Sequence, residues 1–251
     1  MPFFDSNGVK IHYQVVGEGP PIVLVHGFAS SLNGNWVLTG WVKRLTDAGR
    51  KVVALDCRGH GESDKPHDRN AYDGDVMSGD VINLMDHLAI RRADLFGYSM
   101  GGMISMQLMV RHPQRFRRIV LGGVGGAARG PQEASAIASA LAADDPSGAT
   151  NEVARRFREF AESQGNDLKA LAACIDRPRP RFDAEMLGTV QAPVLVAVGE
   201  KDDLVGRADA LAAAIPGARF VSIPDRDHLT VVPDPRFKEA ILSFLAEEPF
   251  E

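Results

Sequence analysis

The sequence predicts an α/β protein with a mostly parallel, doubly wound sheet and a helical insertion. Short apolar runs without polar alternation recur along the chain, as in strands whose two faces are both covered by helices. Apolar residues at helical spacing lie between these runs, so strands and helices alternate. With 251 residues, the chain is long enough to bury the core of one such domain.

The first predicted strand, at residues 9–15, differs from the others because its apolar and polar residues alternate. Alternation is typical of a strand with one exposed face, and the turn residues 17–20 follow it, so we expect an antiparallel strand at the edge of the sheet. The other predicted strands are apolar runs bounded by turn residues, at 22–25, 52–55, 93–96, 119–121, 194–198 and 220–223.

Helices are predicted where apolar residues recur three or four positions apart. One apolar stripe runs from Trp36 to Leu45 and predicts a helix that ends before Gly49. Similar stripes predict helices over residues 81–88, 103–110 and 237–245. These segments would cover the two faces of the sheet.

The alternation of strands and helices stops between residues 126 and 188. Only short helical patterns occur there, at 134–143, 153–161, 168–175 and 183–187, separated by proline and glycine. An insertion between two parallel strands most simply covers the carboxyl edge of the sheet, where ligands bind, so we expect a lid. The predicted organisation is a first core part at residues 1–125, a helical lid at 126–188 and a second core part at 189–251.

Composition and charge exclude several classes of protein. The formal net charge is −5 and no basic stripe occurs, which argues against a nucleic-acid partner. No run reaches the roughly 18 apolar residues of a membrane span, and the N-terminal sequence lacks a signal-peptide pattern. Cys57 and Cys174 lack metal-ligand spacing and are expected to be free thiols in a reducing compartment. These features predict a cytoplasmic protein.

The pentapeptide Gly97-Tyr98-Ser99-Met100-Gly101 lies where a predicted strand turns into a predicted helix. A G-x-S-x-G sequence at such a junction is a nucleophile elbow, a turn that projects its serine above the sheet. The serine there occupies strained backbone, and a β-carbon two residues before or after it would collide with the turn. Ser99 is therefore the predicted nucleophile.

A serine nucleophile requires a base, and the base requires an acid that orients it. Of the seven histidines, His228 alone lies in a polar turn after the last predicted strand, from which it can reach Ser99. The loop after the strand at 194–198 carries Asp202 and Asp203. We expect Asp202 to be the acid, with Asp203 as the alternative.

The order Ser99, Asp202, His228 resembles the nucleophile, acid and base order of the α/β-hydrolase family. Residues 24–28 (LVHGF) and 56–63 (DCRGHGES) are similar to two further loops of that family. The resemblance implies the α/β-hydrolase fold and an oxyanion hole formed by the backbone N–H groups of Phe28 and Met100. Met100 follows the nucleophile at a helix N-terminus, where N–H groups have no intrahelical partner.

These residues predict a serine hydrolase that cleaves carboxylic esters of small to medium acyl chains through an acyl-enzyme. No cofactor or metal ion is expected, and the partner is a small-molecule ester or lactone. A serine at position 99 argues against relatives with an aspartate nucleophile, the haloalkane dehalogenases and epoxide hydrolases. The alternatives left open are enol-lactonases, carbon–carbon bond hydrolases, thioesterases and a hydrolase-fold receptor for a small molecule.

The predicted lid offers candidates for substrate contacts. Candidates for lining an apolar acyl pocket are Leu141, Phe157, Phe160, Leu168 and Met186. Candidates for binding a substrate carboxylate are the lid arginines, at positions 155, 156, 177, 179 and 181. His26, in the loop that carries Phe28, is expected to organise that loop.

Overall fold

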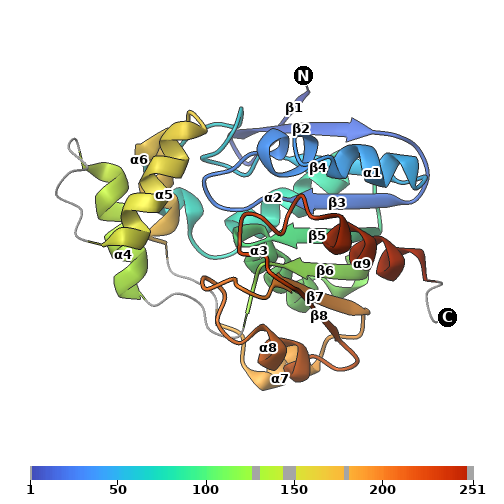
Figure 1. Ribbon diagram of the computed structural model, residues 1–251. Coiled ribbons are helices and arrows are strands. Elements are labelled where there is room, and N and C mark those ends of the chain that lie inside the picture. The colour runs from blue at the N-terminus through green and yellow to red at the C-terminus, as the bar shows by residue number, and fades with distance from the viewer. Residues whose placement is uncertain (1, 126–130, 144–150, 178–180, 248–251) are drawn as a thin grey trace.

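The computed structural model describes residues 2–125, 131–143, 151–177 and 181–247. These residues form a sheet of eight strands in the order β1-β2-β4-β3-β5-β6-β7-β8 (Figure 1). The strands are β1 (Phe3–Ser6), β2 (Val9–Val16), β3 (Pro21–Val25), β4 (Lys51–Leu55), β5 (Ala93–Tyr98), β6 (Phe116–Gly122), β7 (Val194–Gly199) and β8 (Arg219–Ile223). Pairing is antiparallel between β1, β2 and β4 and parallel elsewhere, which confirms the predicted sheet.

The edge of the sheet differs from the prediction. β2, predicted to be the edge strand, pairs with β4 on one side and with β1 on the other. Asn7 and Gly8 connect β1 to β2 with φ angles of 56° and 85°, values that a two-residue hairpin turn requires. The hairpin turn at Asn7-Gly8 lets residues 3–6 pair with β2, so β1 rather than β2 is the edge strand on this side of the sheet.

Helices cover both faces of the sheet, as a doubly wound arrangement requires. The helices are α1 (Trp41–Asp47), α2 (Val76–His87), α3 (Met100–Arg111), α8 (Ala208–Ala214) and α9 (Pro235–Ala246), with short 3₁₀ turns at Arg69–Tyr72 (η2) and Pro113–Arg115 (η3). Within β3, Ile22 and Leu24 belong to the core cluster that includes residues of α1 and α9, whereas Val23 and Val25 belong to the cluster that includes residues of α2, α3 and α8. No helix of the described ranges is long and apolar enough to cross a membrane.

The predicted helix from Trp36 to Leu45 is two separate pieces. A π-helical turn, η1 (Asn33–Val37), precedes α1, and Gly40 between them has a φ of 79°, which is left-handed. Trp36 and Trp41 are nevertheless both fully buried. The apolar spacing therefore predicted correctly that these side chains are buried, but Gly40 divides the predicted helix in two.

The insertion contains helices throughout the part that is described. α4 (Pro131–Ala142), α5 (Glu152–Ser163) and α6 (Leu168–Ile175) contact one another and lie together beside the core in Figure 1; we call them the insertion helices. The fourth helix, α7 (Ala184–Gly188), lies instead beside α8. The predicted start of the lid at residue 126 lies outside the described residues.

Candidate active site

Ser99 lies in a strained turn between β5 and α3, with φ of 53° and ψ of −111°. A β-carbon on Gly97 would come within 2.1 Å of the carbonyl oxygen of Gly101. On Gly101, it would come within 1.9 Å of the carbonyl oxygen of Val25. The turn therefore excludes any side chain at either glycine, which explains the pentapeptide.

Three predicted residues meet at the carboxyl ends of β5, β7 and β8. The Nε2 atom of His228 is 2.9 Å from Oγ of Ser99, and its Nδ1 atom is 2.7 Å from a carboxylate oxygen of Asp202. The Asp202 carboxylate is completely buried and also accepts a hydrogen bond from the N–H of Leu204. Because Asp202 accepts a hydrogen bond from Nδ1–H, the proton of the neutral ring stays on Nδ1. Nε2 is left as an acceptor that faces the serine.

Asp203, the alternative acid, is placed differently. Its side chain is exposed and lines a cavity. Within the described residues it has no hydrogen bond with His228, whereas Asp202 does. The geometry favours Asp202 as the partner of His228.

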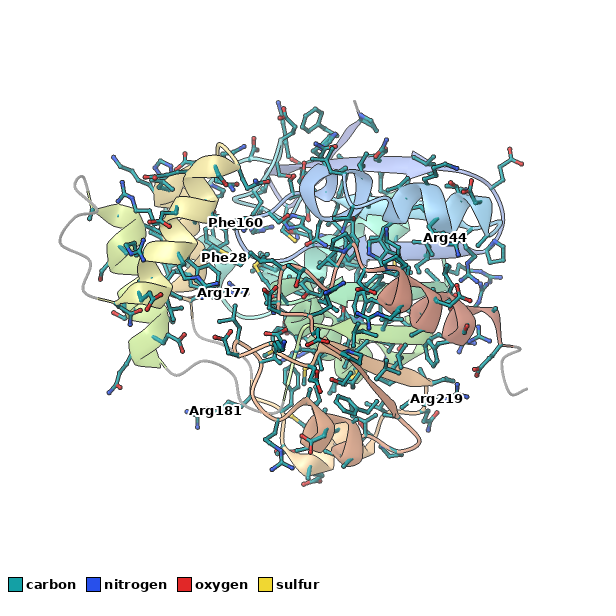
Figure 2. All side chains as sticks on the ribbon, in the orientation of Figure 1. Phe28, Arg44, Phe160, Arg177, Arg181 and Arg219 are labelled. Atoms are coloured by element: carbon teal, nitrogen blue, oxygen red, sulfur yellow. The ribbon has the colours of Figure 1, made fainter. Side chains whose placement is uncertain are left out.

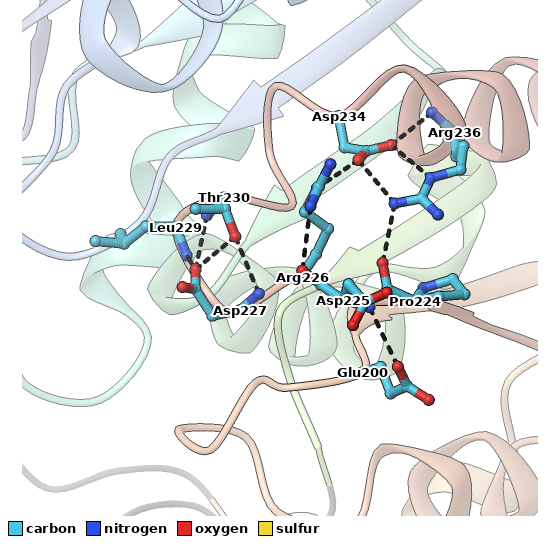
Figure 3. Close-up of polar contacts among 9 residues, drawn as sticks. All are labelled: Glu200, Pro224, Asp225, Arg226, Asp227, Leu229, Thr230, Asp234 and Arg236. Carbon is cyan, nitrogen blue, oxygen red and sulfur yellow. Dashed lines mark hydrogen bonds and ion pairs between the residues drawn. The ribbon is translucent and has the colours of Figure 1, made fainter.

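The loop that carries His228 is held by its own polar contacts (Figure 3). The Asp227 carboxylate accepts hydrogen bonds of 2.8 Å from both the N–H and the hydroxyl of Thr230, and these contacts hold the pKa of Asp227 below its usual range. Arg226 donates to Asp234 over 2.6 Å. The histidine backbone is thus anchored on both sides.

Tyr98 contacts His228 through its hydroxyl group and its ring, and the sequence did not predict this contact. Its hydroxyl donates a hydrogen bond to the carbonyl oxygen of His228, and the two rings lie 5.2 Å apart. Burial raises the pKa of Tyr98, with a smaller contribution from the charge of Asp202, so the hydroxyl keeps its proton. The sequence could not predict this contact, because Tyr98 occupies a variable position of the G-x-S-x-G pattern that requires no particular side chain.

The two predicted oxyanion donors flank Ser99. Met100 is the first residue of α3, so its N–H has no intrahelical acceptor. The loop before Phe28 lies against the serine, since a β-carbon on Gly27 would lie 3.4 Å from Cβ of Ser99. Within the described residues, neither the Phe28 N–H nor the Met100 N–H donates to another protein group. Both remain available to a ligand.

His26 connects two loops near the site. Its Nε2 accepts a hydrogen bond from the N–H of Cys57, and its Nδ1 donates to the carbonyl oxygen of Gly27 over 2.8 Å. Burial lowers the pKa of His26, which keeps the ring neutral and able to accept from Cys57. These contacts agree with a loop-organising role.

A cavity of about 360 Å³ opens beside Ser99 and His228. Phe157 and Phe160 of α5 form part of its wall, together with Phe28 from the core. In Figure 2, Phe28 and Phe160 lie between the insertion helices and the core. The cavity is therefore bounded on one side by the insertion.

Two of the five predicted pocket residues, Phe157 and Phe160, line this cavity. Leu141 is buried in the packing of the insertion helices, and Leu168 packs against the core cluster. Met186 lies on α7 and is half exposed, away from the cavity wall. Sequence spacing identified the apolar face of α5 but could not tell which helices face the cavity.

Of the arginines predicted to bind a substrate carboxylate, only one lines the cavity among those described. Arg156 of α5 contributes to its wall. Arg177 instead donates to the carbonyl oxygen of Cys174 over 2.6 Å, and Arg181 lies well apart from Phe160 in Figure 2. Arg179 lies outside the described residues.

Cys57 and Cys174 are both buried, and they are not joined in a disulfide. Burial raises the pKa of the Cys57 thiol, and the nearby Cys174 raises it further, so the thiol is not a reactive thiolate. In the portions of the chain that are described, no three His, Cys, Asp or Glu side chains are grouped to hold a metal ion.

The comparison with known proteins shows the family to which the chain belongs. A model of the alpha/beta hydrolase fold family matches residues 20–178, so the chain belongs to the α/β-hydrolase family. It is similar to the solved enol-lactonase from Burkholderia xenovorans LB400, with 27% identity and a TM-score of 0.82 over 98% of this chain and 100% of that one.

Two curated relatives are similar in sequence. The chain is 36% identical to the dihydrolipoyllysine-residue acetyltransferase component of the acetoin cleaving system of Pseudomonas putida, over 86% of this chain and 61% of that protein. It is also 36% identical to 2-hydroxymuconate semialdehyde hydrolase of Pseudomonas sp. strain CF600, over 47% of this chain and 41% of that protein. The chain therefore spans less than two thirds of these relatives.

Proposed function

We propose that this protein is a serine hydrolase that cleaves carboxylic esters. The observation that carries the proposal is the hydrogen-bonded chain from Asp202 through His228 to Ser99, with distances of 2.7 and 2.9 Å, at the wall of a cavity. A buried carboxylate, an oriented imidazole and a serine on a strained turn form a set that activates a hydroxyl for attack on a carbonyl.

The proposed reaction proceeds by acyl transfer. His228 Nε2 takes the proton of Ser99, and the serine oxygen attacks the ester carbonyl carbon. The negative charge that develops on the carbonyl oxygen is stabilised by the N–H groups of Phe28 and Met100, each of which typically contributes about 10²–10³ in rate. His228 then protonates the departing alcohol, which leaves an acyl-enzyme.

The second half of the reaction releases the acid. His228 removes a proton from water, the resulting hydroxide attacks the acyl carbonyl, and Ser99 regains its proton as it leaves. Asp202 stabilises the imidazolium that forms in each half. These steps need only proton transfer and hydrogen bonds, so we propose that no cofactor or metal ion takes part.

The cavity supports a small to medium acyl group as the substrate. A volume of about 360 Å³ lies at the lower end of the range for small-molecule sites. Phe157 and Phe160 present apolar surface to it, and we propose that the insertion helices act as a lid over the substrate. The two buried thiols, which form no disulfide with each other, also support the proposed cytoplasmic location.

A lactone is the second candidate substrate, because a lactone is a cyclic ester and the same chemistry opens it. The likeness to the enol-lactonase supports this candidate, and so does Arg156 in the cavity wall, which could pair with a substrate carboxylate. The relation to 2-hydroxymuconate semialdehyde hydrolase keeps carbon–carbon cleavage as a further alternative.

The test is steady-state hydrolysis of p-nitrophenyl esters from C2 to C12, with lactones in parallel, by wild type and Ser99→Ala. Multiple turnover that the variant loses supports the proposal, and the chain-length optimum measures the acyl pocket. A preference for lactones over every open-chain ester supports the second candidate. A single slow turnover that leaves a stable covalent adduct would instead indicate a receptor of the hydrolase fold.

A further inference from the structure

The loop of residues 26–30, here called the oxyanion loop, carries the Phe28 N–H and has an unusual conformation. Ala29 is completely buried and has a φ of 59°, in the left-handed region that residues with a β-carbon disfavour. Such a conformation persists only where surrounding contacts hold it. The contacts around Ala29 therefore determine where the Phe28 N–H points.

The upstream end of the oxyanion loop is held by the core. The N–H of Gly27 donates to the side-chain oxygen of Asn35 over 3.0 Å, and the carbonyl oxygen of Gly27 accepts from His26 over 2.8 Å. Both contacts act before Phe28. On the other side of Phe28, the core holds the chain just beyond the loop, where the N–H of Leu32 donates to the Asp56 carboxylate over 2.7 Å.

The carbonyl group of Ala29, within the downstream part of the loop, is held by the insertion. Asn166, in the turn between α5 and α6, donates its side-chain N–H to the carbonyl oxygen of Ala29 over 2.7 Å. The ring of Phe28 also packs against Phe157 of α5, with centroids 5.9 Å apart (Phe28 is labelled in Figure 2). The insertion thus contacts the oxyanion loop at two consecutive residues.

These hydrogen bonds form a continuous chain that ends at the proposed oxyanion donor. Asn166 donates to the Ala29 carbonyl, and the N–H of the same peptide group, that of Ser30, donates to the carbonyl of Gly27 over 3.2 Å. The peptide group of that carbonyl carries the Phe28 N–H. Aligned peptide groups polarise one another, so donation at one end strengthens the donor at the other.

We propose that Asn166 is a positioning residue that holds and polarises the oxyanion loop, so that the insertion completes the oxyanion hole. The inference rests on the proposed function, because the hole has a role only if Ser99 generates an oxyanion. It gives the insertion a part in the chemical step in addition to enclosing the substrate.

The test compares Asn166→Ala with His67→Ala. His67 contacts Asp167, the next residue of the same turn, over 3.0 Å, and so joins the insertion to the core without touching the oxyanion loop. Loss of a whole oxyanion donor costs about 10²–10³ in rate, so a misplaced donor in Asn166→Ala should lower kcat about 10-fold. The loss should be equal for C2 and C8 esters, with KM nearly unchanged, whereas His67→Ala should retain wild-type kcat.

A trifluoromethyl ketone separates the two explanations further, because its adduct with a serine carries the oxyanion. Its affinity should fall in Asn166→Ala by the same factor as kcat. If kcat is unchanged, or if both variants only raise KM for the longer ester, the insertion merely encloses the substrate and the proposal is overturned.

Hydrogen exchange at the amides of residues 27–30 provides a measurement that needs no turnover. Exchange there should be faster in Asn166→Ala than in wild type or His67→Ala, and equal exchange in all three would contradict the positioning role. If wild type hydrolyses no ester or lactone, the proposed function fails, while the exchange data still decide whether Asn166 holds the loop.

Discussion

Two adjacent aspartates follow β7, and only one of them reaches His228. The Asp202 carboxylate accepts a hydrogen bond from the Nδ1–H of His228 over 2.7 Å, while Asp203 is exposed at the cavity wall. We expect Asp202→Asn to lower kcat/KM for p-nitrophenyl butyrate by about 10⁴, because an amide N–H would stabilise the wrong imidazole tautomer. Asp203→Asn should change it by less than about threefold, since a screened surface charge contributes little. The reverse ranking would assign the acid to Asp203.

Tyr98 illustrates a stabilising contact that lies next to the chemistry without taking part in it. In Tyr98→Phe the buried carbonyl oxygen of His228 loses its donor, so urea unfolding should show a loss of about 1–3 kcal/mol in stability. Tyr13→Phe makes the same chemical change at a part-buried contact with His87 and should cost less. Equal losses of stability in both variants would show that the contact of Tyr98 with His228 stabilises the protein no more than a part-buried hydrogen bond.

Some residues near the cavity could be predicted from the sequence, and others could not. Ser99, Asp202 and His228 could be predicted because each follows a recognisable strand. The contacts of Asn166 and Tyr98 could not be predicted, because neither residue occupies a motif position that requires its side chain. Contacts of that kind become visible only when the chain is folded.

At the scale of elements, two helical glycines differ in whether the structure leaves room for a β-carbon. Gly101 in α3 lies against the backbone of Val25, whereas a β-carbon on Gly79 in α2 would meet nothing within 4 Å. Gly101→Ala should therefore destabilise the protein by at least about 3 kcal/mol, and Gly79→Ala should stabilise it by about 0.5–1 kcal/mol through helix propensity. Thermal and urea unfolding of the two variants measure both effects. A tolerated alanine at position 101 would contradict the close contact at the elbow.

Element boundaries could be predicted where the local pattern was strong. The seven predicted strands all form, six of them from unbroken apolar runs between turn residues and β2 from the alternation of apolar and polar residues. β1 was missed because its four residues are too short for periodicity, although Asn7-Gly8 marked its turn. The prediction of one continuous helix over residues 36–45 was wrong, because Gly40 adopts a left-handed conformation.

At the scale of the whole molecule, buried histidines should make stability depend on pH. Burial lowers the pKa of both His26 and His60, so between these lowered values and about 6.5 the unfolded chain binds more protons than the folded one. Stability is therefore highest above pH 6.5 and falls as the pH decreases, by up to about 1.4 kcal/mol per pH unit for each histidine.

Urea unfolding at pH 7.5 and pH 5.5 measures this dependence. Wild type should be less stable at pH 5.5, and His60→Asn should show a smaller difference because it removes one of the two buried histidines with a lowered pKa. Carboxyl groups with lowered pKa, such as that of Asp227, lose their contribution only below about pH 4 and lie outside this window. Equal stability at the two pH values would contradict neutral, buried histidines.

The most direct test of the whole proposal is the covalent intermediate. Wild type and Ser99→Ala would be quenched in acid during hydrolysis of p-nitrophenyl butyrate, and their intact and peptide masses would be measured. The proposed mechanism predicts a butyryl group on the peptide that contains Ser99 and none in the variant. Steady turnover in wild type that persists in Ser99→Ala, or an acyl group on another residue, would show that Ser99 is not the nucleophile.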